Sequence, residues 1–144
     1  MKSKYLGRRR VTLVVRRKLM ITLVPTRLHS IKDDGIDDPS DLCAHSPIHF
    51  QIDGKTLIAP KDGDAAVNAA AIYLLRTLER DHTKEDPVGD QLFPCCGHAM
   101  FDTGHEDVMI CGCPFGSDVF VTSSPDGMVQ LTRSEEHTSE LQSQ

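Results

Sequence analysis

One stretch of this chain has the apolar spacing of an amphipathic helix, and that limits the fold more than any other feature. Between Asp64 and Asp81, apolar residues recur three or four positions apart, which places them on one helix face. Asp62 or Asp64 is expected to cap the first turn, because a carboxylate accepts hydrogen bonds from the free amides there. The residues expected to face the core are Val67, Ala70, Ala71, Leu74, Leu75 and Leu78.

The remaining apolar segments are short and have the character of strands. Ile48 to Ala59 predicts a hairpin, with Asp53-Gly54 as its two-residue turn and Phe50 opposite Leu57. We therefore expect an α+β fold, a small antiparallel sheet with one main helix, about residues 64–81, packed on one face. The other predicted strands are Ile21 to Val24, Leu92 to Phe101, Val108 to Cys113, Asp118 to Thr122 and Met128 to Thr132.

Residues 1–19 form a basic head, with eight basic residues and no acidic one. Its apolar run is too short for the core of a signal peptide. Two interpretations remain: translation upstream of a true start at Met20, or a disordered basic arm. Val11 to Val15 can also add an edge strand.

The other end of the chain reads RSEEHTSELQS from Arg133 to Ser143. These eleven consecutive residues resemble one reading frame of a translated sequencing adapter. We therefore predict a single domain at residues 20–132, in a natural chain that continues past Thr132. Residues 133–144 are predicted to be an artefactual disordered tail, and residues 134–144 are expected to make no contact with the core, since the segment is too polar to fold alone.

The predicted domain is strongly acidic, because 18 acidic residues stand against 7 basic ones in residues 20–132, giving a formal charge of −11. That charge repels nucleic acid and attracts basic partners.

No segment is apolar enough for a membrane span. The chain has an odd number of cysteines, five, which favours a reducing, cytoplasmic location. The acidic segment Ile31 to Asp41 is predicted to be a solvated loop.

Cysteine and histidine form one chemically suggestive cluster. Cys95 and His98 are a C-x-x-H pair, and Cys111 and Cys113 are a C-x-C pair. Together they offer four ligands for zinc, and Gly97 would allow a tight turn around the ion. Packing is the alternative, because a C-x-C half is less common in zinc sites and a buried thiol behaves as a small apolar group. The possible substitute ligands are Cys43, His45 and Cys96.

A cysteine-dependent enzyme is a further hypothesis. In it, Cys95 or Cys96 is activated by His98 or His82, with an aspartate orienting the histidine. The sequence contains no recognisable oxyanion loop, and such sites are identified by geometry rather than proximity in sequence. A non-enzymatic function is therefore favoured.

Three segments, AAIYLLRTLERDHT, PVGDQLFPCCGHAMF and VMICGCPFGSDVFV, lie between residues 69 and 121. They resemble small bacterial proteins associated with the immunity proteins of polymorphic toxin systems. The resemblance implies a cytoplasmic inhibitor that binds one toxin domain, and it assigns no binding residue. The resemblance and the acidic charge of the domain lead to the same main hypothesis. In it, the chain is a protein-binding protein whose partner is a basic toxin domain. The zinc-stabilised module and the cysteine-dependent enzyme remain the alternatives.

Overall fold

The computed structural model describes residues 12–15, 20–36, 38–96, 99–105, 107–112 and 115–134. Within them, antiparallel strands in small sheets accompany a single α-helix, which confirms the predicted α+β class. In chain order, the elements are β1 (Thr12–Val15), β2 (Ile21–Pro25), β3 (His45–Ile52), β4 (Lys55–Ile58), a 3-10 turn (Pro60–Asp62), β5 (Asp64–Ala66), α1 (Val67–Arg76), β6 (Phe93–Pro94), β7 (Ala99–Asp102), β8 (Val108–Cys111), β9 (Gly116–Ser117), β10 (Val119–Ser123) and β11 (Val129–Arg133).

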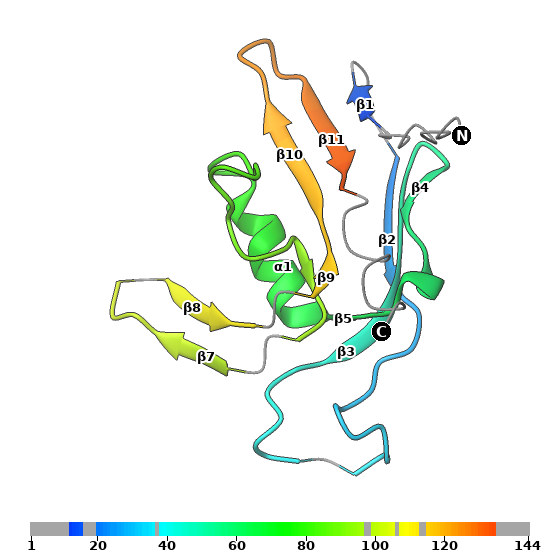
Figure 1. Cartoon of the computed structure of the whole chain (residues 1–144), viewed down its shortest axis with the longest axis vertical. Coiled ribbons are helices and arrows are strands. Elements are labelled where there is room, and N and C mark those ends of the chain that lie inside the picture. Colours follow the sequence, from blue (N-terminus) through cyan, green and yellow to red (C-terminus); the bar gives the residue numbers. More distant parts are fainter. Residues whose placement is uncertain are drawn as a thin grey trace, which may run out of the picture.

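Two of the sheets carry most of the strands (Figure 1). One has the order β2-β3-β4, with β5 also paired to β3, and the other has the order β1-β11-β10. The hairpin of β7 and β8 extends away from both. β3 is the central strand because Ile48, Phe50 and Ile52 alternate along it and all three are buried.

The predicted turn at Asp53-Gly54 is confirmed, but the pairing beyond it is shifted. Asp53 and Gly54 have φ values of 47° and 76°, the left-handed conformation that a tight hairpin turn requires. Phe50 pairs with Ile58 and not with Leu57, because the register shifts between Phe50 and Gln51. This irregularity lets both Leu57 and Ile58 be buried.

The helix is shorter than predicted and turned toward a different face. α1 spans Val67–Arg76, and its N-cap residue, Ala66, makes no side-chain capping bond. The predicted acidic cap is therefore wrong. The buried positions are Ala69, Ala70 and Tyr73, whereas Ala71, Leu75 and Leu78, predicted to face the core, are exposed. Helical spacing defined an apolar surface, but the neighbouring strands cover only part of it.

The main core joins β3, β4, α1, β6, β10 and β11. Phe50 and Phe93 meet at its centre, with ring centroids 5.4 Å apart. A smaller cluster lies at the start of α1, where Cys43, Ala66 and Ala69 are buried. Met100 and Ile110 pack against this smaller cluster, so it connects the β7–β8 hairpin to the helix.

Both predicted end segments include residues that contact the domain. Thr12–Val15 form β1 and pair with β11, in agreement with the edge strand considered for that segment. Arg133 lies in β11, and the Ser134 N–H donates to the Asp118 carbonyl over 3.1 Å. The expectation of no contact for residues 134–144 therefore fails at Ser134, and Arg133 lies in a strand rather than in a disordered tail. Residues 1–11, 16–19 and 135–144 lie outside the described residues, and the predictions for them stay predictions.

Candidate functional site

An open apolar groove with a volume of about 1560 Å³ lies between α1, β2, β3 and the β10–β11 hairpin. Four large apolar side chains line it and remain exposed: Ile21 by 61%, Leu23 by 38%, Leu75 by 64% and Leu78 by 82%. They come from β2, from α1 and from the turn after α1. The groove therefore contains the apolar face of α1 that the core leaves uncovered.

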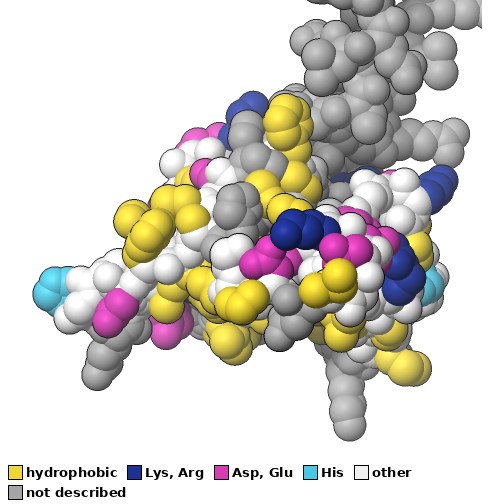
Figure 2. Space-filling model, turned by 90° about the horizontal axis from the view of Figure 1, so that it is seen from below, with side chains coloured by type: hydrophobic (Ala, Val, Ile, Leu, Met, Phe, Trp, Pro, Cys, Tyr) yellow, Lys and Arg dark blue, Asp and Glu magenta, His cyan; other side chains and the backbone are white. Residues whose placement is uncertain are grey.

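Among the described residues that line the groove, one is charged, and it is acidic. Asp126 lines it directly, in the β10–β11 turn. Two arginines that follow the apolar positions of α1 are paired elsewhere: Arg76 with Asp107 and Arg80 with Asp86, at 2.7 Å and 2.9 Å. On the face shown in Figure 2, hydrophobic side chains lie among both acidic and basic side chains.

A second candidate site lies at the entry to β3. Asp41, Cys43 and His45 each offer one ligand atom, and these atoms lie within 4.8 Å of one another. Cys43 is 6% exposed and His45 is 4% exposed. Nε2 of His45 is buried without a hydrogen-bond partner in the described part of the chain. An oxygen, a sulfur and a nitrogen ligand are thus close enough to hold one metal ion.

Hydrogen bonds involving the backbone hold both Asp41 and His45 in place. The N–H groups of Ile31 and Cys43 donate to Oδ2 and Oδ1 of Asp41, at 2.7 Å and 3.1 Å. They lower the pKa of that carboxyl, which keeps it ionised. His45 exchanges two backbone hydrogen bonds with His29, each 2.9 Å long. Its other neighbour is Ala66 of β5.

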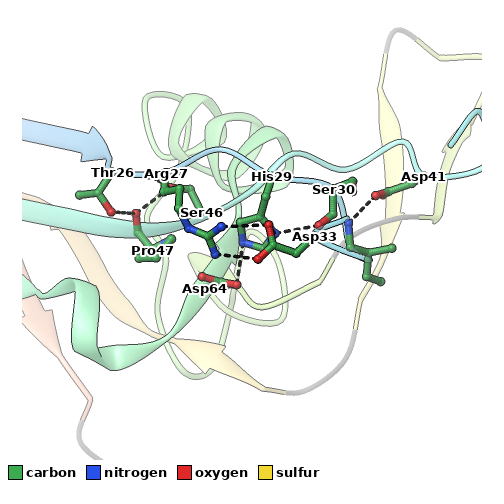
Figure 3. Close-up of polar contacts among 10 residues, drawn as sticks. Thr26, Arg27, His29, Ser30, Asp33, Asp41, Ser46, Pro47 and Asp64 are labelled. Carbon is green, nitrogen blue, oxygen red and sulfur yellow. Dashed lines mark hydrogen bonds and ion pairs between the residues drawn. The ribbon is translucent and has the colours of Figure 1, made fainter. Parts of the chain in front are cut away.

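A chain of polar contacts runs through the segment after β2 as far as Asp41 (Figure 3). His29 Nε2 lies 2.9 Å from an oxygen of Asp64, and His29 Nδ1 lies 2.7 Å from the Ser30 carbonyl. The guanidinium of Arg27 makes two 2.9 Å bonds to Asp33, and these lower the pKa of the Asp33 carboxyl. The contacts attach the loop after β2 to β5, next to the three possible ligands.

The structure tests the predicted zinc ligands only in part. His98 and Cys113 lie outside the described residues, so the four-ligand site stays a prediction. Cys95 is half-buried and its N–H donates to the Phe115 carbonyl, while Cys111 is exposed at the end of β8. Of the substitutes, Cys96 is half-buried, whereas Cys43 and His45 belong to the group described above.

His82 does not take the role of a base for a cysteine in this structure. It is fully buried, its Nδ1 accepts the Val88 N–H at 3.0 Å, and its Nε2 lies 2.8 Å from Oδ1 of Asp118. An aspartate does orient it, as the enzyme hypothesis requires. The nitrogen that should face a thiol is instead bonded to the backbone.

Comparisons with protein-family models, curated proteins and solved structures found no match for this chain. Within the described residues, no helix has both the length and the apolar character needed to cross a membrane.

Cys43 and His45 are among the ligands predicted from the sequence, whereas Asp41 was predicted to lie in a solvated loop. The signal was present as an Asp-x-Cys-x-His pattern, with ligands at alternate positions. Alternate side chains of an extended segment share one side. No sequence pattern predicted the groove, because the groove depends on which part of the apolar surface of α1 the neighbouring strands cover.

Proposed function

We propose that this chain is a protein-binding protein whose partner inserts an apolar and basic segment into the groove beside α1. The observation that carries the proposal is the exposure of Leu75 and Leu78, next to Ile21 and Leu23, in one open groove. Contiguous exposed apolar surface of this kind marks an interaction site. Burying these four side chains would provide the apolar centre of an interface.

The dimensions of the groove favour a protein segment over a small molecule. Pockets for drug-sized ligands measure about 300–1,000 Å³ and enclose most of the ligand. This groove is larger, at about 1560 Å³, and it is open to solvent along α1 and β2. A helix or strand of a partner, with apolar residues on one side, matches that shape.

The charge of the domain supports a basic partner. Residues 20–132 have a formal charge of −11, which speeds association with a basic protein and disfavours acidic ones. Together with the resemblance noted above, this supports an immunity-type function in the bacterial cytoplasm, with a basic toxin domain as the partner.

The test uses the full chain, purified and mixed with each toxin-like product of the neighbouring genes. Leu78→Asp and Leu75→Asp should weaken binding by at least about tenfold, because each puts a charge into the buried centre of the interface. Met109→Asp is the matched control, since Met109 is 52% exposed on the β7–β8 hairpin, outside the groove.

Three outcomes would contradict the proposal. The first is that no neighbouring product binds and no cell is protected. The second is that Met109→Asp weakens binding as much as Leu78→Asp does. The third is that the chain dimerises by light scattering and Leu78→Asp makes it monomeric, because the groove would then be an interface between two copies.

A zinc-stabilised module is the second candidate, and the group of Asp41, Cys43 and His45 favours it. Zinc accepts carboxylate, thiolate and imidazole ligands. The test is the metal content of protein purified without chelator, followed by chelation. Substoichiometric zinc and unchanged unfolding after chelation would remove this candidate.

A further inference from the structure

We propose that Asp41, Cys43 and His45 form a three-ligand site for a thiophilic divalent cation such as zinc. The inference deepens the zinc-stabilised module, on which it rests, by assigning the ligands and leaving one coordination position for water or another ligand. It differs from the four-ligand site expected at Cys95, His98, Cys111 and Cys113.

The geometry is the first argument. The three ligand atoms lie within 4.8 Å of one another. Two ligands about 2.0–2.3 Å from one zinc ion are separated by less than that limit. Small side-chain movements are therefore sufficient to close the site around an ion.

Burial of His45 is the second, independent argument. The residue is 4% exposed, and its Nε2 has no hydrogen-bond partner in the described residues. A buried polar atom without a partner costs free energy, and native structures usually satisfy it. A bound cation, or the water coordinated to it, would give Nε2 of His45 the partner that this nitrogen lacks.

The third argument is that the site is held in place before any ion arrives. The Val67 N–H donates to the Ala44 carbonyl at 2.7 Å, and Asn68 Nδ2 donates to the Leu42 carbonyl at 2.8 Å. The start of α1 thus holds the residues between the ligands. With the carboxylate of Asp41 fixed by two N–H groups, little order has to be created on binding.

The ligand types decide which cation fits. Calcium and magnesium prefer oxygen ligands only, so a site with a thiolate and an imidazole selects softer metals. On binding, the Cys43 thiol loses its proton to solvent and the sulfur forms a bond to the metal. One thiolate and one carboxylate then balance the two positive charges of the ion.

The experiment is a cobalt titration of the full chain after removal of bound metal, since cobalt(II) replaces zinc and absorbs strongly when bound to a thiolate. We expect saturation at one ion per chain. Cys43→Ser should abolish the thiolate–cobalt absorption, and His45→Ala should weaken binding by at least about tenfold, the scale expected for loss of a ligand or its support. His49→Ala is the matched control and should leave both unchanged, and Cys111→Ser distinguishes this site from the four-ligand site expected at Cys95, His98, Cys111 and Cys113.

Asp41→Asn keeps the site testable if the buried substitutions impair folding. Asp41 is more exposed than the other two ligands, and the amide oxygen of asparagine can still accept one of the two N–H groups. We expect unchanged circular dichroism with at least about tenfold weaker cobalt binding.

Each contrary outcome has a separate meaning. Absorption that survives Cys43→Ser but is lost in Cys111→Ser would overturn this site and leave the zinc module intact at the other cysteines. Unchanged affinity in both Asp41→Asn and His45→Ala would also overturn it. Absence of saturable binding to the wild-type chain would overturn both the site and the module.

Discussion

Nε2 of His82 and Oδ1 of Asp118 are 2.8 Å apart, and this contact joins the segment after α1 to the start of β10. The Leu92 N–H donates to the same carboxylate oxygen at 3.0 Å, and the Val88 N–H donates to Nδ1 of His82 at 3.0 Å. His82 also exchanges two backbone bonds with Val121. One buried imidazole therefore organises the loop that covers the core.

The first prediction concerns this imidazole. His82→Ala should lower the free energy of unfolding by about 2–4 kcal/mol, because it leaves the Val88 N–H without its acceptor and removes one of the partners of the Asp118 carboxylate. Urea unfolding measures the change. His105→Ala, at an exposed position, should stay within about 0.5 kcal/mol of the wild type. Equal effects of the two substitutions would show that the contact does not stabilise the fold.

The second prediction concerns stability in acid. Hydrogen bonds from the Lys32 ammonium and from Ser40 lower the pKa of the Asp38 carboxyl from 3.8 to about 2. Because the unfolded chain takes up this proton first, the stabilisation is complete above about pH 4 and is lost as the pH falls toward 2.

Asp38→Asn should therefore flatten the decline of the urea midpoint between pH 4 and pH 2. Asp34→Asn, in the same loop, should keep the steepness of the wild type, since it leaves Asp38 and its donors intact. A decline equally steep in Asp38→Asn and the wild type would refute the role of Asp38.

The third prediction concerns the β7–β8 hairpin. Arg76 of α1 donates to the Val108 carbonyl and the Asp107 carboxylate, and also to the Val88 carbonyl. Arg76→Met should speed amide hydrogen exchange in β7 and β8 while leaving β10 and β11 unchanged, because the hairpin loses the hydrogen bonds that Arg76 donates to it and keeps its apolar contacts.

Arg80→Met is the control for that experiment, since the Arg80–Asp86 pair is exposed at both side chains and such pairs contribute little. If exchange in β7 and β8 is the same in both variants, Arg76 does not hold the hairpin.

The fourth prediction concerns the aromatic centre of the core. Phe93 is 1% exposed and packs on Phe50. Phe93→Ala should cost about 3–5 kcal/mol by leaving a cavity, or unfold the chain outright. Phe101→Ala, at an exposed position of β7, should cost less than about 1 kcal/mol in the same thermal or urea unfolding measurement.

The sequence by itself determined features that depend on neighbouring residues. Alternation at Ile48, Phe50 and Ile52 predicted a half-buried strand, and Asp53-Gly54 predicted a turn that needs positive φ. The period of a strand and the conformational freedom of turn residues are local properties, so they can be read without knowing the fold.

Only the tertiary structure decided the pairing of Phe50 with Ile58, the covered face of α1 and the surroundings of His45. Leu75 and Leu78 have the same helical spacing as buried residues, yet the available strands pack on Ala69, Ala70 and Tyr73 instead. His45 meets His29 and Ala66, which are distant in the sequence. Burial depends on what the rest of the chain places opposite each side chain, and no local pattern contains that information.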